Sequence, residues 1–347
     1  MNQVPFDLEL SKNREVPIDS DSIIELRDRC FPEIIGTEKH DINYWLWKHN
    51  PKGNLDQSHY LIAKEKSSNN LAGFYATIPL NYSTPSGPVV VGMVCDVMTS
   101  PDFQGRGVFY QLGLQSVSTF LSGKFDTLTG YPIRENVLPG HRKVGWKFTE
   151  KLPILISPAL RAFWFFLSIV GKKRNYRTVA ISPVEIVKAQ GFEEFYEKWK
   201  RTAKQSNWSY LDIDHNFMTW RYSAPGVRYL CSVVRNTNDE MVGYAIGRRL
   251  RIGRFNFLVI GDIRCIEQTV VPHLIRNLRS QTQKVIAVAG MFSDETRSHL
   301  NLNKSGFLKT PKKFLLIQFT RQMLDPSHGK DSTLISPYLT WSDTDDI

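Results

Sequence analysis

The stretch that decides the fold is residues 96–109, DVMTSPDFQGRGVF. Before it, residues 89–98 are apolar and rich in β-branched side chains, which predicts a buried strand that Pro101 ends. After it, apolar residues recur at helical spacing, at Phe109, Leu112, Val117, Phe120 and Leu121. Residues 104–107 therefore form a short loop between the carboxyl end of a strand and the start of a helix. That junction predicts an α/β fold.

The same loop is suited to an anion. The first amides of a helix have no partner inside it and carry the positive end of its dipole. Gly105 and Gly107 remove side chains that would keep a phosphate away, and Arg106 adds a positive charge. The loop Gln104–Val108 therefore predicts a site for a diphosphate-bearing ligand.

The chain also repeats itself in order, which indicates two copies of one fold. The matched features are Asn43 and Asn216, Trp47 and Trp220, Lys48 and Arg221, Tyr60-Leu61 and Tyr229-Leu230, Gly73 and Gly243, Asp96 and Asp262, and the Gly-aromatic pairs at 145–146 and 306–307. Each copy predicts a helix, two strands joined by a polar turn, a third strand ending near the aspartate, a helix of about 107–121 or 267–281, a strand of 125–130 or 284–290, and a last helix. Repetition of the tryptophans favours core packing over sugar stacking.

This plan predicts two α/β domains, each with a mixed central sheet flanked by helices. The expected boundaries are 1–150 for the first domain, 151–204 for an apolar and basic linker with helices, 205–324 for the second domain and 325–347 for a loosely held polar tail. The second copy has no glycine loop after Asp262. We therefore expect it to bind no cofactor and to serve as a structural or substrate-binding half.

Composition adds weaker constraints. The net charge of +10 suits an anionic partner. The four cysteines have no metal-site spacing and predict reduced thiols in a cytoplasmic protein. The apolar segment 152–170 predicts either a linker helix buried between domains or, with its basic flank, an in-plane membrane contact through 157–174. Zinc-ligand spacing and an aromatic ladder are both missing from the sequence, which gives no support to nucleic-acid binding.

Gln104-x-x-Gly107 after a strand resembles the acetyl-CoA motif of the GNAT acyltransferase superfamily, and the likeness extends to residues 99–103 and to Gly145-Trp146. The longer pattern resembles tandem GNAT proteins linked to surface-polysaccharide synthesis, closely over 15–150 and more loosely over 205–320. The resemblance implies acetyl-CoA or another acyl-CoA as co-substrate and a small-molecule amine as acceptor. One position departs from the motif, because its last Gly/Ala is Phe109 here. That ring would crowd a pyrophosphate if it pointed there, and its place on the apolar stripe favours the sheet.

The resemblance also implies roles for single residues. Backbone around Met98 and Thr99 would pair with the pantetheine arm, and amides of Gly105, Arg106, Gly107, Val108 and Phe109 would hold the pyrophosphate. Asp96 is a candidate base or a paired strand-end aspartate, and His141 is a candidate proton donor to the thiolate or a surface histidine. Asn136 or Ile133 would take the place of a family asparagine. Tyr131 would line the acceptor pocket or pack in the core.

Three functions follow as alternatives. The first is acyl-CoA-dependent N-acylation of a primary amine, for example on an amino sugar or sugar nucleotide. The second is an aminoacyl-tRNA-dependent transferase acting on peptidoglycan precursors, against which the intact Gln104–Gly107 loop argues. The third is a non-catalytic pair of degenerate GNAT domains, for which Phe109 and the missing second loop argue.

Overall fold

The computed structural model describes residues 8–12, 21–49, 58–159, 176–328, 333–334 and 336–344. The first half contains β1 (Leu8–Lys12), α1 (Asp21–Cys30), η1 (Pro32–Ile34), η2 (Glu38–His40), α2 (Ile42–His49), β2 (His59–Glu65), β3 (Leu71–Thr84), β4 (Gly87–Thr99), η3 (Pro101–Phe103), α3 (Val108–Leu121), β5 (Thr127–Gly130), η4 (Glu135–Val137), α4 (Leu138–Val144) and β6 (Lys147–Pro158). The strand and helix expected on either side of the glycine loop are β4 and α3.

The second half repeats the plan. It contains β7 (Arg177–Ile181), η5 (Pro183–Lys188), α6 (Phe192–Gln205), β8 (Ser209–Leu211), α7 (His215–Arg221), β9 (Tyr229–Arg235), β10 (Met241–Ile252), β11 (Phe255–Cys265), η6 (Gln268–Val270), α8 (Val271–Ser280), β12 (Ala287–Met291), α9 (Asp294–His299), β13 (Leu308–Thr320), α10 (Arg321–Leu324), β14 (Pro337–Tyr338) and η7 (Trp341–Asp343).

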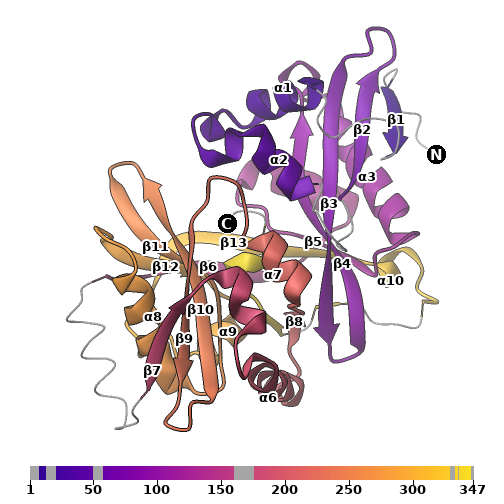
Figure 1. Ribbon diagram of the computed structural model, residues 1–347. Helices are drawn as coiled ribbons and strands as arrows, with labels where there is room; N and C mark the ends of the chain where they lie inside the picture. Colours follow the sequence, from indigo (N-terminus) through magenta and orange to yellow (C-terminus); the bar gives the residue numbers. More distant parts are fainter. Residues whose placement is uncertain are drawn as a thin grey trace.

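The strands of both halves join in one continuous mixed sheet. Its order is β1-β2-β3-β4-β5-β13-β6-β12-β11-β10-β9-β7 (Figure 1), and off this order β8 pairs with β3 and β14 pairs with β8. The pairs β4–β5 and β11–β12 are parallel, and their neighbours along this order are antiparallel. The predicted α/β fold with a mixed sheet is confirmed. The two sheets that we expected are joined through β6 and β13 into one continuous sheet. The expected domain boundaries stay a prediction.

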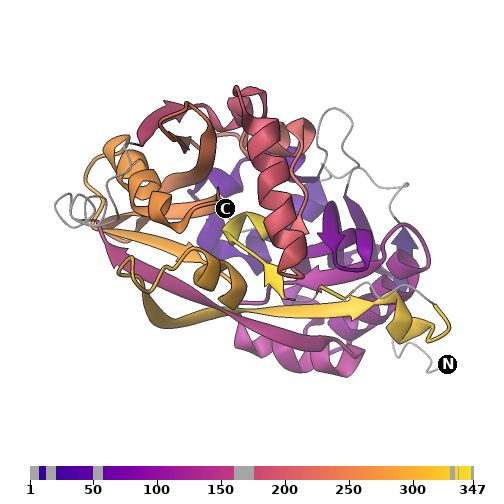
Figure 2. The same cartoon turned by 90° about the horizontal axis from the view of Figure 1, so that it is seen from below.

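The last strand of each half pairs with the other half. β13 extends from the second half to lie against β5, where Ile317 faces Gly130. In return, β6 lies against β12, where Ile154 faces Met291. β6 and β13 also pair with each other at the centre of the sheet, and Figure 2 shows them running side by side across the molecule. Each half is therefore completed by a strand from the other.

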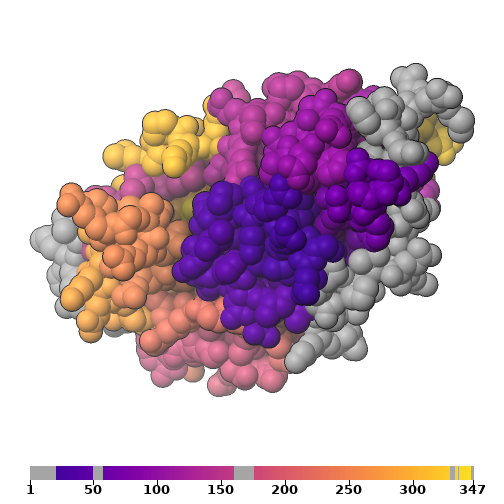
Figure 3. Space-filling model, turned by 90° about the horizontal axis from the view of Figure 1, so that it is seen from above, coloured from indigo at the N-terminus to yellow at the C-terminus, as the bar shows by residue number. Residues whose placement is uncertain are grey.

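Three apolar clusters stabilise this arrangement. One lies under α3 and α4 and includes Phe319 of β13, and a second lies under α8 and includes Leu155 of β6. The third is shared, because it joins α1 and α2 of the first half to α6 and α7 of the second. In Figure 3, the α1–α2 segment lies on one face of the molecule beside the β10–β11 hairpin. Burial of apolar surface thus links the halves as well as the layers.

Trp47 and Trp220, the repeated tryptophans, contact each other between the halves. Trp47 Nε1–H donates to the carbonyl of Trp220 at 2.6 Å, and Trp220 Nε1–H donates to the carbonyl of Trp47 at 2.9 Å. Their rings are stacked, with centroids 5.7 Å apart. Each indole N–H is satisfied by the backbone carbonyl of the other tryptophan, so the interpretation as core packing is confirmed.

The expectation of a loosely held tail over 325–347 is wrong for residues 337–344, whereas residues 325–327 are exposed. Residues 337–340 and 342–344 are buried, and β14 pairs with β8. Asp343 accepts hydrogen bonds from the Tyr82 hydroxyl at 2.7 Å and from the Thr340 amide. Burial raises the pKa of Asp343 to about 6. The polar composition of this segment predicted exposure to solvent. In the structure its polar side chains instead form hydrogen bonds inside the core.

The expected linker 151–204 begins as sheet, since β6 runs to Pro158, and ends in α6. The apolar segment 152–170, expected as a helix, is strand up to Pro158, and its residues from 160 on lie outside the described residues, as does most of the membrane contact expected through 157–174. Within the described chain, the helices are all too short or too polar to cross a membrane.

Candidate active site

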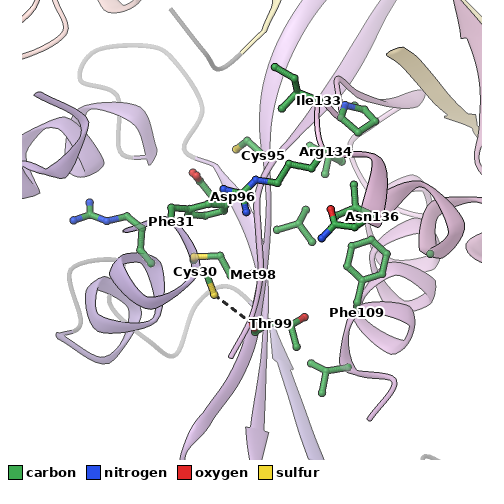
Figure 4. Close-up of a pocket in the computed structure, with 18 of the residues that line it drawn as sticks. Cys30, Phe31, Cys95, Asp96, Met98, Thr99, Phe109, Ile133, Arg134 and Asn136 are labelled. Atoms are coloured by element: carbon green, nitrogen blue, oxygen red, sulfur yellow. Dashed lines mark hydrogen bonds between the residues drawn. The ribbon is translucent and has the colours of Figure 1, made fainter. Parts of the chain in front are cut away.

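A cavity of about 680 Å³ lies over the carboxyl ends of β4 and β5. α1 and α2 form one wall, and the glycine loop, α3 and α4 form the other (Figure 4). The residues expected at the site and found in its lining are Asp96, Met98, Thr99, Gln104, Gly105, Gly107, Val108, Phe109, Tyr131, Asn136 and His141, together with Ile133. The structure thus brings together nearly all of the predicted site. Arg106 is not in the lining, and its guanidinium lies 5.3 Å from the centre of the Phe103 ring.

The cavity exists because β4 extends beyond the end of its parallel neighbour β5. β4 and β5 pair only from Val91–Thr127 to Val94–Gly130, after which β5 ends and β4 continues to Thr99. Cys95, Met98 and Thr99 still pair with β3 on their other side. One edge of the β4 backbone therefore faces the cavity, where it offers hydrogen-bonding groups to an extended ligand.

The glycine loop opens the far end of the cavity. Gly105 and Gly107 have φ of +73° and +82°, which lie in the left-handed region that side chains avoid. Gly107 caps α3, and a Cβ at either glycine would meet open space. α3 therefore presents the amides of its first turn toward the cavity without obstruction. This geometry suits an anionic group such as a pyrophosphate.

Phe109 points neither at that open space nor at the sheet. Its ring packs on α4, where a Cβ added at Gly140 would lie 2.5 Å from Phe109 Cε1. The ring also meets the His141 ring edge-on, with centroids 5.1 Å apart. The preference for the sheet is wrong because Gly140 leaves room for the ring on α4. The Phe109 side chain thus accounts for the departure from the motif without filling the loop.

Asp96 lies in a bulge of β4. Asp96 and Val97 together oppose the single residue Tyr75 of β3, and Asp96 has a φ of +45°. Copy two carries a matching irregularity beside Asp262. A left-handed aspartate costs roughly 1–2 kcal/mol, so neighbouring groups must hold it there. The bulge turns the carboxylate toward α2 and the cavity.

Lys48 and His49 of α2 hold this carboxylate, and both were missed in the sequence. Lys48 Nζ and His49 Nε2 each lie 2.7 Å from Asp96 Oδ2. Because a carboxylate only accepts, His49 Nε2 carries a proton, while His49 Nδ1 lies 3.0 Å from Ser58 Oγ. Burial alone would raise the pKa of Asp96, but these partners outweigh it and hold the pKa well below its usual range. The match of Lys48 to Arg221 was a signal for Lys48; His49 has no counterpart in copy two.

His141 is buried in α4 rather than on the surface. Its ring is held edge-on between Phe109 and Trp146. Burial lowers the pKa of His141 to about 4. The imidazole is therefore neutral at physiological pH, where it donates or accepts a hydrogen bond but carries no readily released proton. Its role as proton donor to a thiolate stays a prediction.

The remaining predicted residues occupy distinct parts of the cavity. Tyr131 follows β5 and is buried, and burial next to Asp343 raises its pKa above the usual range. Asn136 lies in η4 on the exposed rim. Met98 is buried, and the carbonyl of Thr99 accepts a 3.4 Å hydrogen bond from the Cys30 thiol. α1 thus contacts the end of β4 directly.

A donor set of His49, Cys95 and Asp96 has its ligand atoms within 4.8 Å of one another. Lys48 Nζ lies 2.7 Å from the same Asp96 oxygen that His49 contacts. A metal ion at this point would meet the positive charge of that ammonium, so the arrangement favours an ion pair over a cation site.

The corresponding place in the second half is filled by protein. Arg264, which follows the repeated Asp262 as Met98 follows Asp96, is 3% exposed. Its guanidinium lies 4.4 Å from the Trp199 ring of α6 and donates to the Leu211 carbonyl. The Tyr244 hydroxyl donates to Asp262 at 2.5 Å. These contacts agree with the absence of a glycine loop in this half.

Comparisons with known proteins agree with this geometry. Residues 17–149 match the family model described as the acetyltransferase (GNAT) domain. The sequence matches no functionally curated protein at significant similarity. A solved GCN5-related N-acetyltransferase from Anabaena variabilis has a TM-score of 0.65 at 13% identity, with 91% of this chain and 73% of that chain covered.

Two further solved structures are similar over the same length. A GCN5-related N-acetyltransferase from Kribbella flavida has a TM-score of 0.60 at 14% identity, covering 92% of this chain and 72% of its own. A conserved protein of unknown function from Enterococcus faecalis, described as a candidate N-acyltransferase, has a TM-score of 0.64 at 11% identity, covering 91% and 73%. These likenesses extend the shared fold to both halves. The family match over residues 17–149 adds a likeness in sequence to the acetyltransferase (GNAT) domain in the N-terminal part of the chain.

Proposed function

We propose that the protein is an acyl-CoA-dependent N-acyltransferase that acts on the primary amine of a small molecule. The observation that carries the proposal is the pair of left-handed glycines at the start of α3, open toward a cavity where β4 runs free of β5. An acyl-CoA has a diphosphate, an extended amide-bearing arm and a thioester, and each matches one part of this cavity. Gly105 to Phe109 would hold the diphosphate, and the edge of β4 at Met98 and Thr99 would pair with the arm.

The bound acyl-CoA would supply an activated thioester carbonyl. Asp96 would orient the acceptor rather than take its proton, because Lys48 and His49 keep its carboxylate ionised. Because Lys48 already neutralises this carboxylate, Asp96 would accept a hydrogen bond from the acceptor amine and so hold its nitrogen beside the arm. The proton would then leave through water, since an ammonium cannot attack. Tyr131 and Asn136 would line the acceptor side.

Cofactor binding is the first test. Acetyl-CoA at about a hundred times its dissociation constant should stabilise the protein by about 2.7 kcal/mol and raise its melting temperature. Gly107→Glu should abolish that shift, because it places a carboxylate where the diphosphate would lie. Gly87→Glu is the matched control, since Gly87 also has a positive φ and open space but begins β4 directly after the β3–β4 turn, at the other end of the strand. A shift that persists in Gly107→Glu would sink the site assignment.

The acceptor class is the second test. We propose an amino sugar or sugar nucleotide, which suits the net charge of +10 when the acceptor is anionic. A panel of such amines, assayed by release of free CoA thiol, should give turnover that depends on acceptor. Binding of acetyl-CoA with no thiol release across the panel would favour a non-catalytic module. Absence of acetyl-CoA binding would reopen the aminoacyl-tRNA alternative.

A further inference from the structure

A group of exposed side chains lies at one end of the sheet. There β10, β11, β12, β6 and β13 end or begin next to one another, at the left of Figure 1. We call this the basic sheet end and define it by its exposed residues: Arg249, Arg251, Ile252, Arg254, Phe255, Lys284, Ile286, Leu308, Lys309, Lys312 and Lys313. Figure 3 shows the orange hairpin and the yellow start of β13 on the same side of the molecule.

The hairpin of β10 and β11 has two chemically different faces. Ile252 pairs with Phe255 and Leu250 pairs with Phe257, so these apolar side chains share one face. Arg249 and Arg251 alternate with them and lie on the other. Arg254 occupies the turn, with its guanidinium 5.1 Å from the Phe255 ring. The tip is therefore amphipathic, with cations beside exposed apolar groups.

Neighbouring strands continue the pattern. Ile286 donates its amide to the Asn256 carbonyl beside the hairpin, and Leu308 pairs with Ile156 of β6. The side chains of Ile252, Phe255, Ile286 and Leu308 are between 44 and 69% exposed. The stretches 249–261, 281–293 and 304–320 contain no Asp or Glu. Glu38, which reaches the base of the hairpin, is ion-paired with Arg248 at 2.5 Å.

We propose that the basic sheet end docks on the surface of an anionic lipid bilayer. Its cations match the phosphate and carboxylate headgroups, and arginine and lysine stems let apolar neighbours enter the acyl boundary while the charges stay in water. A nucleic acid would use the cations but gain little from aliphatic side chains such as Ile252, Ile286 and Leu308. The exposed aliphatic groups therefore favour a bilayer. The contact expected through residues 157–174 begins at this same end of the sheet, where Ala159 donates its amide to the carbonyl of Ile286.

Vesicle flotation of the full chain tests the proposal. The protein should float with vesicles of phosphatidylcholine mixed with phosphatidylserine, bind pure phosphatidylcholine weakly, and release as salt rises. Replacing Arg251 and Arg254 by Ser should lower the partition coefficient roughly fivefold for each charge. Replacing Ile252 and Phe255 by Ser should lower it roughly tenfold or more. Arg201→Ser and Leu114→Ser are matched controls on α6 and α3, and should bind like the parent.

Several outcomes would overturn the proposal. The parent chain could fail to float with anionic vesicles, or both hairpin variants could float like the parent, which would assign any binding to another segment. Binding of a labelled DNA duplex to the same variants tests the nucleic-acid alternative. If Arg251 and Arg254 are needed for DNA binding while Ile252 and Phe255 are dispensable for both ligands, the surface is a nucleic-acid site. Unchanged melting temperatures would show that each variant is folded.

Discussion

At the scale of single residues, burial decides what a side chain can do chemically. His141 and Asp96 both line the cavity, yet their surroundings act in opposite directions. The apolar rings around His141 disfavour its charged form. Lys48 and His49 favour the charged form of Asp96. Neither side chain therefore has the proton affinity that its residue type alone would suggest.

The first prediction concerns His141 and acid stability. In the unfolded chain the pKa of a histidine is near 6.5, whereas burial lowers that of His141 to about 4. Between these values the unfolded state binds more protons, so the stability is full above about pH 6.5 and is lost as the pH falls toward about 4. Between pH 7.5 and pH 5, the titration of His141 should therefore lower the unfolding free energy of the native chain by about 2 kcal/mol.

Urea unfolding of the native chain and of His141→Phe at both pH values measures this term, because the other titrating groups cancel in the difference. The variant should lose less stability than the native chain on acidification. Equal losses in the two proteins would show that His141 is accessible to protons in the folded state.

The second prediction concerns the tryptophan pair. Trp47→Phe removes the donor to the carbonyl of Trp220 and should cost about 1–3 kcal/mol of unfolding free energy. Trp220→Phe should cost a similar amount, and the double variant should cost less than the sum, because the residues interact directly. Trp341→Phe is the control, since its buried indole N–H has no hydrogen-bond partner among the described residues. Strict additivity would contradict a coupled pair.

At the scale of elements, the contact between α3 and α4 depends on small residues. A Cβ added at Gly113 of α3 would lie 2.8 Å from Val144, and Gly140 of α4 leaves the space that the Phe109 ring fills. The helices therefore approach closely and hold the cavity wall in place. The phenylalanine at the end of the loop motif and the glycine on α4 form one unit.

The third prediction tests that unit. Gly140→Ala should cost about 1–3 kcal/mol, because the new methyl group overlaps the Phe109 ring. Adding Phe109→Leu should recover part of this loss, since the shorter side chain leaves room for the methyl group. Gly123→Ala is the control, because a Cβ there would lie no closer than 3.5 Å to its neighbours. Thermal or urea unfolding measures each variant, and an additive double variant would contradict the packing argument.

Much of this element structure is readable from the sequence, and the limits have physical causes. The run 89–98 and the helical spacing after Val108 carry local periodicity, so β4 and α3 are predictable from the sequence. The ordered repeats predict two copies of one fold, which stays a prediction. Phe109 was misplaced because the room for it comes from Gly140, on another helix. Lys48 and His49 were missed because a bulge in β4, not sequence proximity, brings Asp96 to them. The buried tail shows that polar composition does not reveal which polar groups find partners.

At the scale of the whole molecule, the exchange of β6 and β13 makes the halves interdependent. Local patterns predicted two copies, but no local pattern records which copy a strand pairs with. Ile317 and Phe319 of β13 pack with Leu128 and Trp146 of the first half. The second half thus supplies part of the core beneath the candidate active site.

The fourth prediction follows from that exchange. A chain split into residues 1–165 and 166–347 should give fragments that show no cooperative unfolding alone, because β5 and β12 each lose a neighbouring strand. Refolding the fragments together should restore a single transition and a complex that elutes as one species. Circular dichroism and size-exclusion chromatography give the readout. Cooperative unfolding of fragment 1–165 by itself would contradict the dependence on β13.

The exchanged strands also set the order of events on the ribosome. When β6 leaves the exit tunnel, neither β12 nor β13, which flank it in the finished sheet, has been translated. The nascent chain must carry an apolar strand with both edges open until residues 287–320 have been synthesised. A pause in translation between the two halves would therefore lengthen the time spent in an aggregation-prone state. A gene truncated before the second half would encode a first half that cannot fold stably, because it lacks β13.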